Sequence, residues 1–269
     1  MASPDILALD FDGVVCDGLL EYFQSAWKAY VEVFQPASST PPAELAERFY
    51  PLRPVVETGW EMPLVLYALI NGTLDEDILA RWSALVPSLL VQAEVEPSTL
   101  ALAVDGVRDR WIGNDITGWL SYQRFYPGVI DRLQQAQVTG VELVIISTKE
   151  GRFIQQLLAQ GGLTIPQERI LGKEVKRPKY ETLRQIKAHR PEAILWFVED
   201  RVKALQAVQS QPDLGDMVLF LADWGYNTAA DRALASPGSG LHRLSLPQFC
   251  GSFAGWLDQP AEDSNAIAS

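Results

Sequence analysis

Four short apolar runs constrain the fold of this chain more than any other feature. Each is almost continuously hydrophobic, and they lie at residues 5–9, 141–146, 193–198 and 217–221. Strands buried on both faces have this composition, and they occur in parallel sheets that are covered by helices on either side. A helical pattern at 150–160 ends at Gly161-Gly162, and another follows at 180–188. The sequence therefore predicts an α/β fold with a Rossmann-like, doubly wound parallel sheet.

The stretch from 17 to 122 interrupts this alternation of strands and helices. It has no strand pattern, and its first part carries one apolar helical face that includes Phe23, Trp27 and Tyr30. Proline-rich breaks separate further helical patterns at 43–50, 63–70, 74–92, 98–111 and 115–122. We expect a helical domain at 17–122, inserted into a core formed by 1–16 and 123–257. The small, polar residues 258–269 are expected to form a disordered tail.

The charge and the hydropathy of the chain limit the classes of partner that it is expected to bind. Its 269 residues carry a formal net charge of −12, which repels nucleic acid and anionic membranes, so we expect neither as a partner. An anionic substrate would need a local metal ion or lysines. No apolar run is long enough to span a membrane and the N-terminus has no signal pattern, so we expect a cytoplasmic protein, either a monomer or a homodimer. Both cysteines, Cys16 and Cys250, are expected to be buried thiols.

Polar residues follow three of the apolar runs. Asp10 and Asp12 end the first, Ser147-Thr148-Lys149 end the second, and Glu199-Asp200 end the third. Ligands bind at the carboxyl ends of the strands in an open parallel sheet. The sequence therefore brings three distant segments to one crevice.

Asp10 and Asp12 stand two residues apart, so they share one face of an extended chain. Gly13 allows a tight turn and a close approach of the backbone to a ligand. Paired carboxylates repel each other unless a cation or a proton relieves them, and Asp200 would add a third. Ligands that are all oxygen suit Mg²⁺. A single Asp after a strand is more often a helix cap or a turn residue, but the ordered set with Ser147 favours a functional site.

These motifs resemble those of the haloacid dehalogenase-like superfamily. Asp10-Phe11-Asp12-Gly13-Val14-Val15 is similar to its first motif, and Val144–Lys149 is similar to its second. Phe197–Arg201 resembles the fourth, in the Glu-Asp form of the phosphoglycolate phosphatase and β-phosphoglucomutase branch. Tyr126-Pro127-Gly128-Val129 resembles the segment that re-enters the core after a helical cap, and Trp224-Gly225-Tyr226 resembles a later loop of that branch.

The third motif departs from the family pattern, which has a lysine at the start of the helix before the Glu-Asp strand. Lys173, Lys176 and Lys179 are candidates, and Arg177-Pro178 stands where many relatives have Lys-Pro. We favour Lys179, since this alignment keeps a lysine at the helix start. The family's acid four residues after Asp200 is also missing, because Ala204 stands there, which leaves Glu199 as the only supporting acid.

The resemblance implies a role for each matched residue. Asp10 would be the covalent nucleophile, and Asp12 the general acid and base. Mg²⁺ would lie between the Asp10 carboxylate, the Asp12 backbone carbonyl and Asp200, with Glu199 orienting a metal-bound water. Ser147, Lys179 and the Gly13 turn would bind the phosphoryl group. An acid at Asp12 argues against dehalogenation, because a halide leaving group needs no proton.

The resemblance thus implies a magnesium-dependent phosphomonoester hydrolase that acts on a small phosphorylated metabolite. A phosphosugar mutase is the alternative among enzymes, and a non-catalytic binding protein that keeps the fold is the alternative outside them. The cap residues Arg53, Glu57, Trp60 and Glu61 are either substrate contacts or ordinary cap surface. The sequence does not name the ester, and phosphoglycolate is suggested by the resemblance alone.

Overall fold

The computed structural model describes residues 3–258. The chain divides into two compact units: a core unit, formed by the residues up to Asp17 and from Phe125 onward, and a helical unit, Gly18–Arg124. Two short strands, β2 (Cys16–Asp17) and β3 (Arg124–Phe125), pair where the chain leaves and re-enters the core unit. The borders fall close to the expected 17 and 122. Of the expected tail, all but Asp258 lies outside the described residues.

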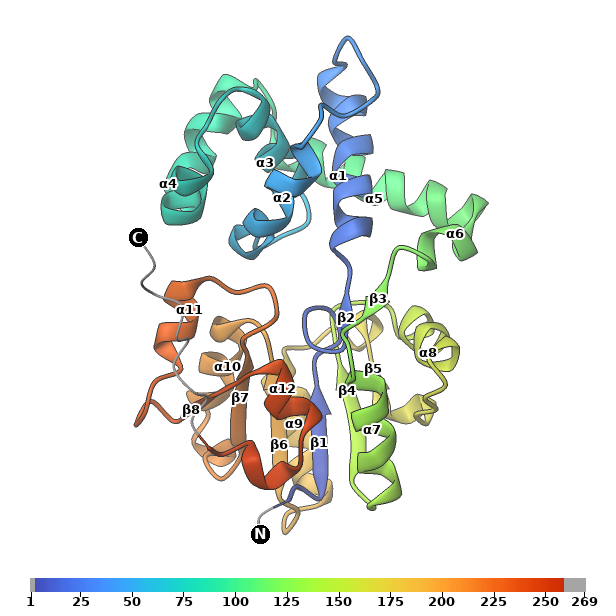
Figure 1. Cartoon of the computed structure of the whole chain (residues 1–269), viewed down its shortest axis with the longest axis vertical. Helices are drawn as coiled ribbons and strands as arrows, with labels where there is room; N and C mark the ends of the chain where they lie inside the picture. Colours follow the sequence, from blue (N-terminus) through green and yellow to red (C-terminus); the bar gives the residue numbers. More distant parts are fainter. Residues whose placement is uncertain (1–2, 259–269) are drawn as a thin grey trace. The chain divides into compact units, whose positions relative to one another are not determined.

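The core unit is built on a six-stranded, entirely parallel sheet, which confirms the predicted α/β fold (Figure 1). Its order is β5-β4-β1-β6-β7-β8. Two edge strands were not expected from the sequence: β5 has only two residues, and β8 has polar residues in its middle. The strands are β1 (Ile6–Leu9), β4 (Glu142–Ile146), β5 (Ile170–Leu171), β6 (Leu195–Glu199), β7 (Val218–Ala222) and β8 (Leu241–Leu244).

Helices cover both faces of this sheet. Residues of α9 and α10 pack on the face that carries Ile6 and Ala8 of β1. On the other face, the rings of Trp196 and Phe220 lie 5.7 and 5.5 Å from that of Trp256. Each fully buried side chain of this size contributes about 1.5–3 kcal/mol. The helices of the core unit are α7 (Val129–Val138), α8 (Gly151–Gln160), α9 (Lys179–His189), α10 (Val202–Gln209), α11 (Ala229–Leu234) and α12 (Leu246–Cys250).

The helical unit has an aromatic core around its first helix. The ring of Trp27 stacks on Tyr30 at 5.2 Å, and that of Phe34 lies 5.0 Å from Tyr67. Trp82 and Trp119 are also buried. Its helices are α1 (Leu19–Phe34), α2 (Leu45–Leu52), α3 (Glu61–Ile70), α4 (Asp75–Gln92), α5 (Pro97–Asn114) and α6 (Ile116–Leu120).

A buried ion pair joins α1 to α5 inside the helical unit. The Glu21 carboxylate, 1% exposed, accepts hydrogen bonds from Arg108 at 2.8 and 2.9 Å and from the Ser25 hydroxyl at 2.5 Å. A carboxylate with so many donors keeps its charge inside a protein at a tolerable cost in free energy.

The two cysteines differ in exposure. Cys16 is fully buried, as expected. Cys250 is only half-buried, and its thiol donates to the carbonyl oxygen of Pro127 at 3.5 Å. The expectation of two buried thiols is therefore wrong for Cys250, which lies at the end of α12, where the chain turns at the surface.

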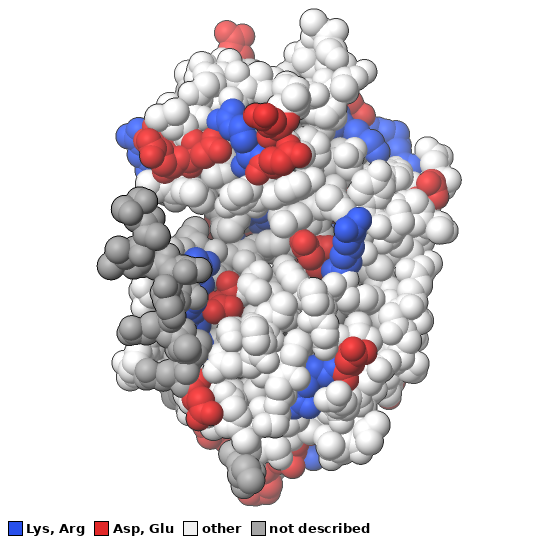
Figure 2. All heavy atoms as spheres, in the orientation of Figure 1, with Lys and Arg blue, Asp and Glu red and all other residues white. Residues whose placement is uncertain are grey.

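Charges of both signs lie next to one another on the face drawn in Figure 2. Arg184 and Asp213 form one of the exposed ion pairs of the core unit, at 2.5 Å. In the described part of the chain, no single helix is both long and apolar enough to cross a membrane; α4 and α5 meet that criterion only as a pair, bent by 93°.

Candidate active site

A tight turn after β1 positions Asp10 and Asp12. The Asp10 N–H still donates to Val198 O at 2.9 Å, so the strand pairing holds its backbone. The Gly13 N–H donates to Cys16 O at 2.8 Å and closes the turn, with Gly13 at φ +90°. A Cβ atom on Gly13 would lie 2.2 Å from Asp200 Oδ2. Glycine is therefore required both by the backbone conformation and by the closeness of the third carboxylate.

Asp200 is held at the end of β6 by the loop after β7. Its Oδ2 accepts a hydrogen bond from the Tyr226 N–H at 2.7 Å, and its backbone oxygen accepts from Asn227 Nδ2 at 3.1 Å. A Cβ atom on Gly225 would lie 2.3 Å from Asp200 Cβ, so only glycine allows this approach. The Asp200 carboxylate is thus held in place by the segment Trp224-Gly225-Tyr226, which resembles a loop of the family.

Asp10, Glu199 and Asp200 form a buried group of carboxylates whose nearest oxygens lie within 4.8 Å of one another. Burial raises the pKa of Asp10 to about 7, against the opposing charge of Lys179. Burial and the neighbouring Glu199 raise the pKa of Asp200 well above its usual range. Bringing acids together in this way is unfavourable unless a cation or protons relieve it.

This group fits a hard divalent cation. Asp200 Oδ1 is buried and has no hydrogen-bond partner among residues 3–258, although Oδ2 of the same carboxylate has one. An oxygen without a hydrogen-bond partner is available to a metal ion, and an all-oxygen set is the kind that Mg²⁺ prefers. Asp10 and Asp200 are the residues that would hold it.

The basic residues proposed for the third motif have different surroundings in the structure. Lys179, the first residue of α9, places Nζ 2.9 Å from Asp10 Oδ1 and 2.6 Å from Glu199 Oε2. Burial opposes its charge, but the two carboxylates outweigh burial and raise its pKa. Arg177 instead donates to the Thr182 hydroxyl at 2.9 Å. Lys173 and Lys176 lie in and just after a short 3₁₀ turn before α9.

Glu199 differs from the other two carboxylates, because both of its oxygens are already engaged. Oε2 faces Lys179, and Oε1 accepts from the Arg201 N–H at 3.0 Å. This arrangement makes Glu199 the residue that orients Lys179 against Asp10. Its expected contact with a metal-bound water stays a prediction.

Ser147 follows β4 at the same edge of the sheet. It is 7% exposed, and its backbone N–H donates to Leu171 O at 3.0 Å. Its Oγ accepts from the Lys149 N–H at 3.2 Å, which leaves the hydroxyl proton to be donated to a ligand oxygen.

Sequence reasoning gave no role to Lys149, which the structure pairs with Asp12. Nζ lies 2.9 Å from Asp12 Oδ1, and the lysine side chain is 9% exposed. The Asp12 side chain consequently lies outside the group formed by Asp10, Glu199 and Asp200. Its position two residues beyond Ser147, at the end of a predicted core strand, is the signal that could have found this lysine.

Two tyrosines complete the surroundings of the turn. The Tyr226 hydroxyl donates to Asp17 Oδ1 at 2.9 Å. Burial and then the Asp17 carboxylate raise the pKa of Tyr126, so its hydroxyl stays protonated. Arg201 donates to Tyr226 O at 2.8 Å and supports the same loop.

The proposed cap contacts have structural partners within the helical unit. Glu61 Oε2 accepts from the backbone N–H groups of Glu57 and Thr58, at 2.5 and 3.2 Å, and so holds the segment before α3 against the first residue of that helix. The Arg53 guanidinium lies 4.7 Å from the centre of the Tyr22 ring. Trp60 is half-buried and directly precedes α3. Contact of these residues with a substrate stays a prediction.

Solved structures resemble this chain, although no protein-family model and no curated protein matches its sequence. A predicted phosphoglycolate phosphatase from Haemophilus somnus aligns at TM-score 0.53 and 17% identity, over 84% of this chain and 88% of its own. A predicted phosphatase from Clostridium acetobutylicum gives 0.52 and 15%, over 93% and 97%. A haloacid dehalogenase-like family hydrolase from Streptococcus pneumoniae gives 0.52 and 14%, over 90% and 94%.

At these identities the likeness concerns the fold. The site residues lie where the carboxyl ends of β1, β4 and β6 meet, the position at which an open α/β sheet binds its ligands. The chain has the α/β fold of the haloacid dehalogenase-like hydrolases, with a helical unit inserted between β2 and β3.

Proposed function

We propose that this protein is a magnesium-dependent phosphomonoester hydrolase that acts on a small phosphorylated metabolite. The observation that carries the proposal is the placement of Lys179 Nζ 2.9 Å from Asp10 Oδ1, beside the partly unsatisfied carboxylate of Asp200. A carboxylate with a fixed cation on one side and a candidate metal ligand on the other is equipped to attack an anionic phosphorus centre.

In the first step, an Asp10 oxygen attacks phosphorus and the bond from phosphorus to the ester oxygen breaks. Asp12 gives its proton to that oxygen, and the alcohol leaves. In the second step, Asp12 takes a proton from water as the water oxygen attacks the aspartyl-phosphate, which releases phosphate and restores Asp10. General acid and base catalysis of this kind contributes roughly 10²–10⁴ in rate.

The surrounding residues position these two aspartates and the phosphoryl group. Lys179 favours the ionised form of Asp10 and can hold a phosphoryl oxygen, and the Ser147 hydroxyl can donate to another. Lys149 fixes the orientation of the Asp12 carboxylate. When bound by Asp10 and Asp200, Mg²⁺ would neutralise negative charge that otherwise keeps the nucleophile and the phosphate apart.

The test is phosphate release from a panel of small phosphate esters, with and without added Mg²⁺, by the wild type and the Asp10→Asn variant. 2-Phosphoglycolate belongs in the panel, since a predicted phosphoglycolate phosphatase shares the fold. Asp216→Asn, which changes an exposed carboxylate paired with Lys187, is the matched control. We expect magnesium-dependent release in the wild type and the control, and loss in Asp10→Asn.

Equal release by Asp10→Asn and wild type would overturn the covalent mechanism. If the wild type releases no phosphate from any ester, hydrolysis itself is the wrong reaction. A mutase is then tested by the conversion of a hexose 1-phosphate in the presence of a hexose bisphosphate.

A further inference from the structure

Arg132 of α7 is a buried cation that pairs with no carboxylate of residues 3–258. The residue is 6% exposed, and its Nε and Nη2 atoms have no hydrogen-bond partner among residues 3–258. Two other cations of the core unit with little exposure both face carboxylates: Lys149 faces Asp12, and Lys179 faces Asp10 and Glu199. Buried charges in proteins are as a rule paired and hydrogen-bonded, so an unpaired guanidinium is unusual, above all in a chain with 34 acidic residues.

The neighbours of Arg132 do not satisfy its donors. The guanidinium lies 3.9 Å from the centre of the Phe253 ring and 5.9 Å from that of Trp256. Attraction to ring faces offsets only part of the cost of burying the charge. Burial lowers the pKa of Arg132. Among the described residues, the Cys250 thiol is the group that raises this pKa. In the described part of the chain, the guanidinium therefore lacks an anionic partner.

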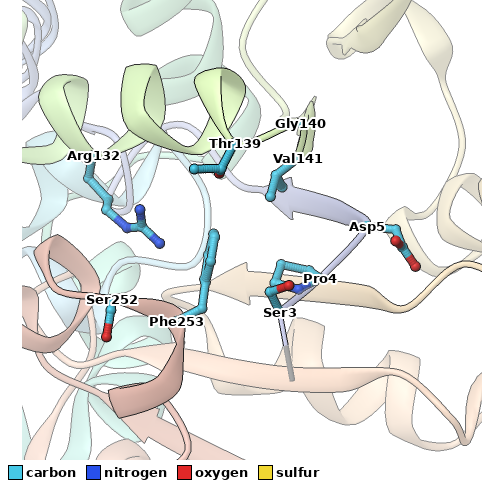
Figure 3. Close-up of a pocket in the computed structure, with 9 residues that line it drawn as sticks. All are labelled: Ser3, Pro4, Asp5, Arg132, Thr139, Gly140, Val141, Ser252 and Phe253. Atoms are coloured by element: carbon cyan, nitrogen blue, oxygen red, sulfur yellow. The ribbon is translucent and has the colours of Figure 1, made fainter. Parts of the chain in front are cut away.

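Arg132 lines a pocket of about 380 Å³ in the core unit, between the start of β1, the turn after α7 and the segment Ser252–Phe253. Figure 3 shows the guanidinium extending from α7 toward Phe253. Asp5, the acidic residue of the pocket, is at the opposite end, with its carboxylate directed away from Arg132 (Figure 3). Its Oδ2 accepts from the Ile194 N–H at 2.8 Å. This volume suits a small molecule.

We propose that this pocket binds a small organic anion, whose carboxylate or phosphate pairs with Arg132 and whose carbon portion packs on Phe253. Nε and Nη2 form one edge of the guanidinium, and two donors in that plane match two oxygens of either group. Both nitrogens are covered by protein atoms in this structure, so binding includes a rotation that turns this edge into the pocket.

The pocket is separate from the candidate active site. Asp5 precedes β1 and Asp10 follows it, so the two residues lie about 16 Å apart along the strand. The proposed ligand therefore does not contact the hydrolytic residues, and its binding can be measured without any assay of phosphate release.

The experiment is a titration of the full-length protein, kept free of magnesium, with acetate and with inorganic phosphate. The readout is the arginine Nε–H resonance in two-dimensional ¹H–¹⁵N spectra, assigned to Arg132 by its absence in Arg132→Lys. We expect a saturable shift of this resonance, and the anion that saturates it at lower concentration identifies carboxylate or phosphate as the preferred group. No saturable shift with either anion overturns the proposal.

Variants distinguish anion binding in this pocket from anion binding at other cationic sites. Isothermal titration calorimetry with the preferred anion is expected to show binding that is weakened about tenfold or more in Arg132→Met. Arg190→Met, which removes an exposed arginine paired with Glu142, is the control and is expected to bind as the wild type does. Equal binding by Arg132→Met and wild type contradicts the assignment. If Arg132→Met does not fold, the titration of the wild-type resonance decides alone.

Discussion

The ammonium group of Lys179 lies between Asp10 and Glu199, at 2.9 Å from Asp10 Oδ1 and 2.6 Å from Glu199 Oε2. It therefore neutralises the proposed nucleophile from a fixed position, since Glu199 is itself held by the Arg201 N–H. The first residue of α9 is thus tied to the residues that follow β1 and end β6.

Replacing Lys179 by methionine is expected to lower kcat by about 10²–10³, because the fixed positive charge at the nucleophile and the phosphoryl group is lost. Steady-state kinetics with the best ester checks this. Lys173→Met is the matched control, because Lys173 was an alternative for the same role and lies before the helix. A larger loss in Lys173→Met than in Lys179→Met would contradict the assignment.

Lys149→Met is expected to affect poor leaving groups more than good ones. Lys149 orients Asp12 at 2.9 Å, and Asp12 is needed most when the departing oxygen must take up a proton. We expect kcat for an alkyl phosphate to fall about tenfold or more, and kcat for p-nitrophenyl phosphate to change little. Equal losses for both esters would show that Lys149 binds the phosphoryl group instead.

The ends of the core strands could be predicted from the sequence, because buried parallel strands are apolar and stop visibly at polar residues. Asp10, Ser147 and Asp200 are predicted as candidate site residues in this way. The partner of Lys149 could not be predicted, since nothing in the local sequence tells where a flexible lysine side chain points. The choice among Lys173, Lys176 and Lys179 stays open in the sequence for the same reason, since the sequence does not tell that α9 begins at Lys179 and that its Nζ lies beside Asp10.

Other features could not be predicted, because their sequence patterns are typical of exposed surface positions. Arg132 lies in a helix among polar residues, a pattern that predicts an exposed side chain. In the structure, its guanidinium packs against the Phe253 ring. The edge strand β8 carries His242 and Arg243 between two buried leucines. An edge strand needs fewer apolar residues than a central one, so its pattern is weak.

Gly13→Ala is expected to destabilise the fold by about 3 kcal/mol or more, since its Cβ atom would clash with Asp200 in addition to straining the backbone. Gly72→Ala is the control: Gly72 also has a positive φ, +83°, but a Cβ atom there meets nothing within 4 Å. Backbone strain alone should cost about 1–2 kcal/mol. Denaturant unfolding of both variants measures the difference, and equal losses would show that Asp200 moves aside freely.

Metal-free protein is expected to lose stability as the pH rises from about 4 to 7. Asp10 has a pKa of about 7 in the folded protein but near its usual value of about 4 when unfolded. The folded state therefore holds more protons in this window, and raising the pH favours unfolding. Mg²⁺ should consequently raise the Tm more at pH 8 than at pH 5.5, as thermal unfolding at both pH values will show.

A variant ties this pH dependence to the carboxylate group. Asp200→Asn removes one of the three charges and should raise the Tm of the metal-free protein at pH 8, whereas Asp216→Asn, at an exposed carboxylate, should not. If Asp200→Asn lowers the Tm instead, the hydrogen bond from the Tyr226 N–H needs a charged acceptor, and this need outweighs the repulsion.

The buried pair Glu21–Arg108 gives a prediction for the helical unit. Arg108→Met removes the guanidinium that donates to both oxygens of a carboxylate 1% exposed, and we expect a loss of about 3–5 kcal/mol. Arg81→Met is the control, because the exposed pair Arg81–Asp77 should be worth only about 0.3–0.5 kcal/mol. Adding Glu21→Gln to Arg108→Met should restore much of the loss, since the buried charge is then gone. Denaturant unfolding of the single and double variants measures this coupling, and a double variant no more stable than Arg108→Met would mean that the arginine acts through its packing and not through its charge.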